Sequence, residues 1–185
     1  MNEDERQLLH ILLGIAAMAL VEFIGVQLAA YVVGIILLFG TILVHLKLSN
    51  FSLGPLEKFV ERFERPGVTP GYGAMTIAAG SLGVMTLVSS KENVLASLLI
   101  LGLGDAASTI VGMRSKKKLP WSAQKTYGGS AAFFVACLPA AYFGGLPAIL
   151  VAALAAAAES LETNIDDNLV IAIVCVIAFR LLSFV

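Results

Sequence analysis

The stretch "LLILGLGDAASTIVGMRSKKKLP", residues 98–120, combines an apolar run, a single carboxylate and a block of cations. Asp105 stands among aliphatic and small residues, and Arg114 and Lys116 to Lys118 follow it. The apolar run is typical of a helix that crosses a membrane. An ionisable side chain at the centre of such a helix costs about 2.5–3.5 kcal/mol on insertion scales, so Asp105 is a candidate functional residue.

The composition of the whole chain supports this interpretation. Of the 185 residues, 58% are hydrophobic and 14% are charged, which is far too apolar for an ordinary soluble domain. With a net charge of −1 the chain has no overall excess of basic residues that would indicate a nucleic-acid partner. The acidic start "MNEDERQ" does not resemble a cleavable signal peptide. Cys137 and Cys175 both lie in apolar segments, so we expect no disulfide framework.

A helix needs about 20 apolar residues to cross a bilayer, and several segments approach that length. They are residues 8–25, 28–46, 71–89, 93–113, 128–144, 146–160 and 168–184. Very tight turns join the first to the second and the fifth to the sixth. We therefore predict an all-α fold, a polytopic integral membrane helix bundle of about seven transmembrane helices that forms a single catalytic domain over residues 1–185. A six-span alternative, in which one segment is fused or dropped, stays open.

The cations predict the orientation of this bundle. With seven spans, the N-terminus and the loops after spans 2, 4 and 6 lie on one side, and that side carries all Lys and Arg residues except Lys91 and Arg180. Cytoplasmic loops are enriched in cations, so we expect a cytoplasmic N-terminus. The protein is then an integral protein of the cell membrane, or of the endoplasmic reticulum membrane in a eukaryote.

The segment between spans 2 and 3, "GPLEKFVERFERPG", has apolar and charged residues on opposite helical faces. Gly54-Pro55 suits a helix start and Pro66-Gly67 suits a stop. The pattern predicts a short amphipathic helix on the cytoplasmic membrane interface. A helix packed on the mouth of the bundle fits the same pattern.

Asp105 shares one face of its helix with small and hydroxyl residues. Gly102, Asp105, Ser108, Thr109 and Gly112 recur at spacings of three, four and seven. A seam of small residues for helix packing explains the glycines and hydroxyls, but it does not explain the acid. We therefore expect Asp105 to face the interior of the bundle and to have a function.

The loop before span 5 carries a second set of candidates. The triple lysine, residues 116–118, is explained by topology or by contact with anionic lipid headgroups. Lys125 differs because it leads "KTYGGS" directly into the helix. A cation, the hydroxyls of Thr126 and Ser130, and glycine N–H groups at a helix N-terminus suit an anion such as phosphate.

The segment "AAAAESLETNIDDNL" forms a third, acidic set at the cytoplasmic end of span 6. Glu159, Glu162 and Asp166 would share a helical face at spacings of three and seven, with Asp167 and Asn168 next to them. Carboxylate and amide oxygens are ligands that Mg²⁺ prefers. A solvated loop explains Glu162 better, whereas "IDDN" between apolar residues indicates a site.

The expected topology brings these three sets to one cytoplasmic mouth. Phosphoryl transfer needs positioning, Mg²⁺ and a cation on the phosphates, and these residue types supply what it needs. The position of the site at membrane depth indicates that one substrate is a lipid.

At these residues the sequence resembles the CTP-dependent lipid kinases, which include dolichol kinase, phytol kinase and yeast-type diacylglycerol kinase. The resemblance rests on "GDAASTIVG" (104–112), "KTYGGS" (125–130) and "ESLETNIDDN" (159–168), in that order. "ERQLLHI" at the start of the first span and "PGYGAMTIAAG" before span 3 add weaker similarity. The resemblance implies a multi-span helical enzyme that transfers the γ-phosphate of CTP to a lipid alcohol, with Mg²⁺ or a similar divalent cation.

The resemblance also implies roles for individual residues. Asp105, as the acid of the "GD" motif, and Lys125 are the predicted catalytic residues, and Gly128 stands where the family usually has an acid in "K-T-x-E-G-S". Phosphate or nucleotide contacts are implied for Thr126, Gly129, Ser130, Glu159 and Asn168, and metal contacts for Asp105 and Asp167. We add Arg114 to the expected nucleotide contacts and Asp166 to the expected metal ligands.

We therefore expect a phosphotransferase that uses CTP to phosphorylate a polyprenol, dolichol, similar isoprenoid alcohol or diacylglycerol at the cytoplasmic face. A cytidylyltransferase that forms a CDP-lipid needs a similar ligand set and stays an alternative. An ion-coupled transporter would carry polar residues toward both faces of the membrane, whereas here they gather at one mouth of the bundle.

Two further residues of the first span are ionisable. Glu22 could line the lipid cleft or pair with a hydroxyl, and His10 is interpreted as interfacial, although it could assist the alcohol.

Overall fold

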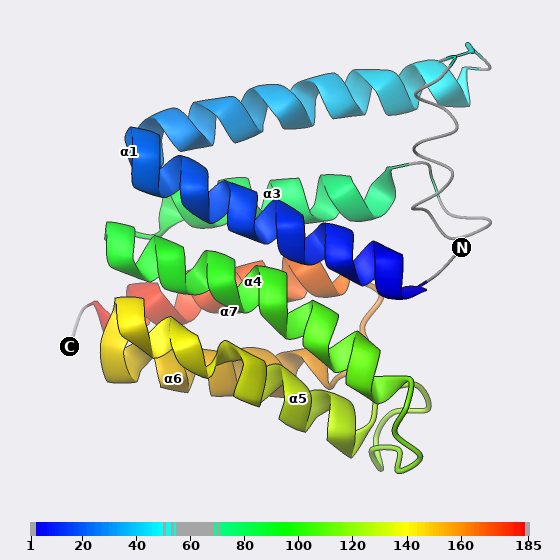
Figure 1. Ribbon diagram of the computed structural model, residues 1–185, viewed down its shortest axis with the longest axis vertical. Coiled ribbons are helices and arrows are strands. Elements are labelled where there is room, and N and C mark those ends of the chain that lie inside the picture. Colours follow the sequence, from blue (N-terminus) through cyan, green and yellow to red (C-terminus); the bar gives the residue numbers. More distant parts are fainter. Residues whose placement is uncertain (1–2, 50, 53, 55–68, 70, 184–185) are drawn as a thin grey trace.

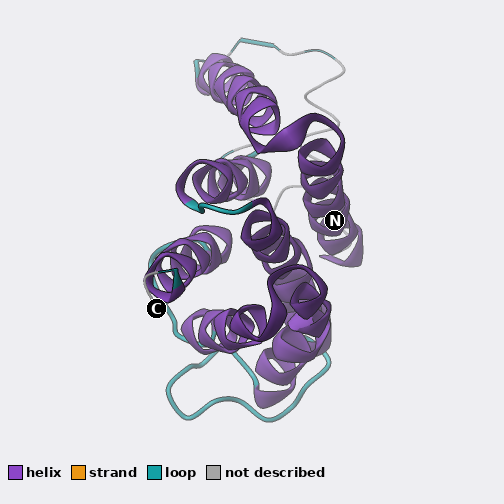
Figure 2. Cartoon of the chain, turned by 90° about the vertical axis from the view of Figure 1, so that its left-hand side faces the viewer, coloured by secondary structure: helices purple, strands orange, loops and turns teal. Residues whose placement is uncertain are grey.

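A computed structural model of the chain describes residues 3–49, 51–52, 54, 69 and 71–183, and helix is the only regular element among them (Figures 1 and 2). The predicted all-α fold is confirmed. In chain order the elements are α1 (Glu3–Leu48), α3 (Tyr72–Leu87), α4 (Lys91–Gly112), α5 (Tyr127–Cys137), the 3₁₀ turn η1 (Leu138–Ala140), α6 (Ala141–Glu159) and α7 (Asp167–Leu182). Most of the segment expected to form an amphipathic helix, residues 55–67, lies outside the described residues.

Three helical stretches are long and apolar enough to cross a membrane. They are Glu3–Leu48, Lys91–Gly112 and Tyr127–Glu159, the last running from α5 through η1 into α6. α3 is apolar but shorter. The helices therefore fit a membrane protein, as the composition predicts, while the number of spans stays a prediction.

Two glycines make the tight turns that the sequence predicts between neighbouring spans. Gly25 has φ +81° and Gly145 has φ +62°, a backbone conformation that glycine adopts far more readily than other residues. At Gly25 the chain folds back, so that α1 consists of two arms that meet at this glycine and diverge from it (Figure 1). Here "first arm" denotes residues 3–24 and "second arm" residues 26–48.

α4 is the central helix of the bundle, and it packs against α1, α3, α5, α6 and α7 (Figure 1). Its start is capped by Ser90, whose hydroxyl accepts a hydrogen bond from the Asn93 N–H at 3.2 Å. Every residue from Val94 to Gly102 is buried. A helix that is apolar all round and buried on all sides is typical of the centre of a membrane bundle.

The small-residue face of α4 lets two neighbouring backbones approach it closely. A Cβ atom added at Gly14 of the first arm would lie 2.9 Å from the Gly102 Cα. A Cβ atom added at Gly129 of α5 would lie 2.9 Å from the Ser108 carbonyl oxygen and 3.3 Å from the Gly112 Cα. The small-residue face of α4 is therefore a helix-packing seam as well as the face that carries Asp105.

The loops that carry the predicted site residues lie at one end of the bundle. Figure 1 shows the N-terminus, the α4–α5 loop and the α6–α7 loop at this end, and the C-terminus at the other. This arrangement brings the end of α4, the start of α5 and the end of α6 together.

We expect Gly14→Ala to destabilise the bundle, because the new methyl group would collide with the backbone of α4. Overpacking of this kind costs about 1–3 kcal/mol. Gly40→Ala in the second arm is the matched control, since a Cβ there meets nothing within 4 Å. The measurement is the free energy of unfolding in detergent, and equal stability of the two variants would contradict the close crossing.

Candidate functional site

Three carboxylates from three elements converge at this end of the bundle. Asp105 of α4, Glu159 at the end of α6 and Asp167 at the start of α7 each offer an oxygen atom, and these atoms lie within 4.8 Å of one another. Asp105 and Glu159 are buried, with 6% and 2% of their surface exposed. Such a concentration of negative charge in an apolar bundle needs a compensating cation.

Lys125 supplies that cation in the structure. Its Nζ donates hydrogen bonds to Glu159 Oε1 at 2.5 Å and to Asp167 Oδ2 at 2.8 Å. Burial lowers the pKa of Lys125, but the charge of Glu159 and hydrogen bonds to both carboxylates outweigh this effect and hold the pKa above its usual value. The ammonium group is therefore charged at neutral pH.

Ser108 connects the face of α4 to this ion pair. Its hydroxyl donates to Glu159 Oε1 at 2.9 Å and lies 3.2 Å from the Asp105 carbonyl oxygen. Glu159 Oε1 thus accepts from both a hydroxyl and an ammonium group. The spacing of three that the sequence shows between Asp105 and Ser108 places both beside the same carboxylate.

The N-terminus of α5 forms another wall of the site. Thr126 caps the helix, with its Oγ1 accepting from the Gly129 N–H at 3.0 Å. The Tyr127 N–H donates to the Lys117 carbonyl oxygen at 3.1 Å. Because two N–H groups of the first turn are used within the chain, the charge of Lys125 is a stronger feature for anion binding here than the backbone.

A polar cleft of about 260 Å³ lies beside these groups. Lys125, Glu159 and Asp167 line it, together with the start of α5 and the last turn of α4. The other residues that line it are Ser108, Thr109, Gly112, Met113, Lys118, Gln124, Thr126, Gly129 and Ser130. A cation and carboxylates therefore face one accessible space.

The α4–α5 loop holds Lys125 in place by backbone hydrogen bonds. The Leu119 N–H donates to the Lys125 carbonyl oxygen at 3.0 Å, next to an isolated antiparallel bridge between Lys118 and Thr126. Trp121 anchors the loop to the end of α6, since its Nε1 donates to the Ser160 carbonyl oxygen at 3.2 Å. The loop is therefore tied to the helix that carries Glu159.

Glu162 has a structural role in the same loop contact. Its Oε1 accepts from the Ser122 hydroxyl at 3.0 Å and from the Gln124 N–H at 2.9 Å. Glu159, Glu162 and Asp166 do not share a helical face, and that prediction is wrong because α6 ends at Glu159. The exposed position of Glu162 agrees with the solvated loop expected for it.

Asp166 and Asn168 lie beside the carboxylate cluster, in a different arrangement from the one predicted. Asp166 caps α7, and its Oδ1 accepts from the Asn168 N–H and from Asn168 Nδ2, both at 3.0 Å. Asn168 is buried and contacts Thr76 Oγ1 at 3.4 Å. The structure puts Glu159 in the cluster with Asp105 and Asp167, while Asp166 positions the helix start that presents Asp167.

Arg114 is outside the cleft. It is exposed, and its guanidinium pairs with Asp4 at 3.1 Å and donates to the Ile110 carbonyl oxygen at 2.6 Å. This contact ties the end of α4 to the start of α1. Gly128, the departure from the family pattern, packs against Ser115, because an added Cβ would lie 2.7 Å from the Ser115 hydroxyl oxygen.

His10 is a site residue whose position the sequence interpretation missed. It is buried rather than interfacial, and its Nδ1 lies 3.7 Å from Asp105 Oδ2. The crossing of Gly14 with Gly102 explains this contact, since His10 and Asp105 each lie about one turn from the crossing in antiparallel helices. The only sequence signal was a histidine one turn before a glycine in an apolar run.

The donor set fits a divalent cation. Two oxygen ligands of one Mg²⁺, each at about 2.1 Å, lie at most about 4.2 Å apart, so small side-chain rotations would bring the three carboxylates to a common ion. Lys125 Nζ would then share a carboxylate oxygen with the ion or lose one of its two hydrogen bonds. A fixed cation beside such an ion is an arrangement that binds phosphate groups.

Fold and site together define a helical protein with a lysine and two carboxylates in one cleft, and a third carboxylate, Asp105, clustered with them, at the end of a bundle apolar enough for a membrane. Among curated proteins, the chain is 36% identical over 102 residues to an uncharacterized protein of Methanocaldococcus jannaschii, MJ1137. The match covers 54% of this chain and 53% of that protein, so the chain spans about half the length of the relative it matches. No family model and no solved structure matches the chain.

We expect Mn²⁺, used as a spectroscopic substitute for Mg²⁺, to bind the cluster, and Asp105→Asn to weaken that binding at least about tenfold. Glu92→Gln removes an exposed carboxylate at the other end of α4 and is the control. The measurement is an EPR titration of free Mn²⁺ with purified protein. Unchanged affinity in a folded Asp105→Asn protein would argue against a metal at this cluster.

Proposed function

We propose that the protein is a membrane-embedded kinase that transfers the γ-phosphate of CTP to a lipid alcohol. One observation carries the proposal: Lys125, Glu159 and Asp167 line a cleft beside the start of α5, and Asp105 is clustered with these two carboxylates. The choice of CTP and of an alcohol acceptor follows from the resemblance of the motifs around these residues to the CTP-dependent lipid kinases.

The charges of the site match what phosphoryl transfer requires. The lipid hydroxyl oxygen forms a bond to the γ-phosphorus, the bond from that phosphorus to the bridging oxygen breaks, CDP leaves, and the hydroxyl proton is released. A divalent cation on the carboxylates supplies charge neutralisation when bound. Lys125 stabilises negative charge on the transferred group, and Thr126 keeps the start of α5 in position beside it.

The proposal includes a topology of about seven transmembrane helices with the cleft on the cytoplasmic side. The turns at Gly25 and Gly145 support the count, because they divide the long helical stretches into segments that run along the bundle. The excess of Lys and Arg in the segments at the cleft end supports the orientation. CTP would then reach the site from water and the alcohol from the bilayer.

We expect Lys125→Met to lower the rate of lipid phosphorylation by about 10²-fold or more, the usual cost of removing one group that stabilises charge in the transition state. Lys116→Met is the matched control, because Lys116 lies in the same loop but does not line the cleft. The measurement is transfer of label from γ-labelled CTP to a polyprenol or diacylglycerol by purified protein. Equal rates for both variants would remove Lys125 from the mechanism.

The position of the label tests the reaction class itself. Label should pass to the lipid from γ-labelled CTP and not from α-labelled CTP. Transfer only from the α position would identify a cytidylyltransferase and overturn the kinase proposal. A wild-type protein that binds Mn²⁺ and CTP but transfers neither label would also overturn the kinase proposal.

A further inference from the structure

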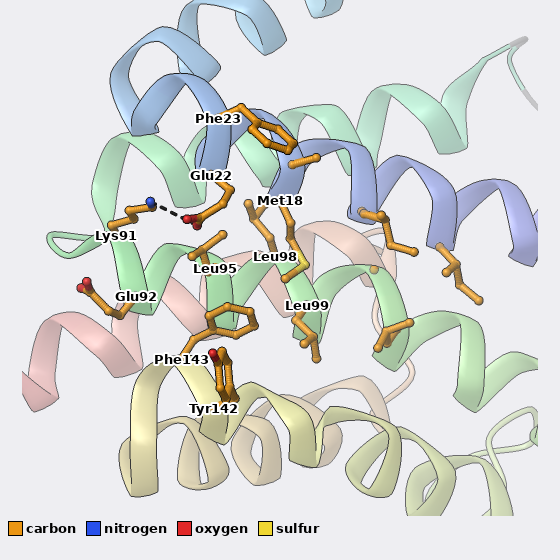
Figure 3. A pocket seen from close by; sticks show the side chains of 16 residues that line it. Met18, Glu22, Phe23, Lys91, Glu92, Leu95, Leu98, Leu99, Tyr142 and Phe143 are labelled. Atoms are coloured by element: carbon orange, nitrogen blue, oxygen red, sulfur yellow. Dashed lines mark ion pairs between the residues drawn. The ribbon is translucent and has the colours of Figure 1, made fainter.

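A second, larger cavity lies away from the carboxylate cluster. It is a groove of about 780 Å³ between the first arm of α1, residues 91–103 of α4 and the start of α6 (Figure 3). Its walls are mostly apolar, and Met18, Leu95, Leu99 and Phe143 point into it in Figure 3. The polar cleft and this groove share no lining residue.

The groove runs along the bundle and ends at the level of Asp105, which does not itself line it. Its lining residues on α4 extend from Lys91 to Leu103, a length of about 18 Å at about 1.5 Å per residue. Ile11 and Leu103 line it, and these residues stand one and two positions from His10 and Asp105, whose side chains lie 3.7 Å apart. The groove therefore extends from the level of the carboxylate site to the opposite end of α4.

Charged residues line one end of the groove. At the end far from Asp105, Lys91 Nζ pairs with Glu22 Oε2 at 3.1 Å, across from α4 to α1 (Figure 3). Glu92 also lines that end. A linear apolar molecule in the groove would therefore lie between a charged pair at one end and the Asp105 region at the other.

The groove is open along its side. Phe23 and Tyr142, which line it, are 86% and 87% exposed, and Ile15 is 53% exposed. In a bilayer these side chains face lipid, so a hydrocarbon chain can enter sideways without crossing water. The groove is parallel to the helices, which is the direction that lipid chains take in a leaflet about 15 Å deep.

We propose that this groove binds one hydrocarbon chain of the lipid alcohol, with the hydroxyl end directed toward Asp105. The proposal rests on the proposed kinase function. Bulk lipid chains compete for any lipid-facing groove, so apolar contact alone gives little preference. The preference for the substrate comes from its hydroxyl group, which a phospholipid chain or a plain hydrocarbon lacks. The groove is longer than one leaflet is deep, so it favours a long extended chain.

Ala19 offers a direct way to fill the groove. It lines the groove and is partly exposed, so a larger side chain there has room to project without disrupting the core. Ala16, three residues earlier on the same arm, is exposed and does not line the groove. Ala19→Phe and Ala16→Phe therefore form a matched pair, with Ala19→Leu as a milder variant if the first does not fold.

The test uses a long-chain isoprenoid alcohol that carries a photoactivatable diazirine in its chain, added to the protein in phospholipid nanodiscs. After irradiation, mass spectrometry locates the labelled residues. We expect label on groove residues of α1, α4 and α6, competed by the unlabelled alcohol but not by added phospholipid or by the hydrocarbon without its hydroxyl. Ala19→Phe should reduce this label several-fold and Ala16→Phe should not.

The outcomes separate the groove from the kinase function, because labelling needs no CTP. Labelling that Ala19→Phe leaves unchanged, label found outside the groove, or equal competition by phospholipid would each overturn the groove proposal. A protein that labels as expected but transfers no phosphate would overturn the kinase function alone. With an active protein, Ala19→Phe should raise the KM for a long-chain alcohol several-fold while leaving a short-chain alcohol nearly unaffected.

Discussion

The hydrogen bonds from Lys125 to Glu159 and Asp167 are the contact on which the rest of the structure depends. Glu159 is buried and Asp105 is buried beside it, at the end of helices that are otherwise apolar. Carboxylates in such surroundings are stable only when they are paired or when they neutralise. A lysine from a separate loop supplies the pairing and joins α6, α7 and the α4–α5 loop at one point.

The architecture around this contact serves to bring separate helices close enough to form it. Glycines in α1, α4 and α5 allow backbone approach at two places on α4, and Asp105 lies between these places while Ser108 belongs to the second. Helix association in lipid relies on such close packing. Lipid tails are as apolar as the helix surfaces, so the hydrophobic effect does not drive the helices together. The small-residue face of α4 therefore brings the helices together and positions the site with the same residues.

Much of this arrangement could be predicted from the sequence, because it depends on local patterns. The helical class follows from the apolar runs, the tight turns coincide with glycines, and Asp105, Lys125, Glu159 and Asp167 stand out as costly charges in apolar surroundings. The errors arose where local patterns do not determine the structure. The predicted face of Glu159, Glu162 and Asp166 required α6 to continue past Glu159. The helix ends there, and Asp166 caps a new helix. His10 was missed because its contact with Asp105 depends on a crossing between α1 and α4.

In the proposed function, the three carboxylates and Lys125 hold a metal–nucleotide complex whose phosphate is transferred to a lipid. The most direct measurement is an anomalous difference map from crystals of the protein grown with Mn²⁺ and a non-hydrolysable analogue of CTP. We expect an Mn²⁺ peak between Asp105, Glu159 and Asp167, with the terminal phosphate of the analogue beside Lys125. A nucleotide and its Mn²⁺ bound elsewhere on the protein, with the ion pairs of Lys125 unchanged, would contradict it.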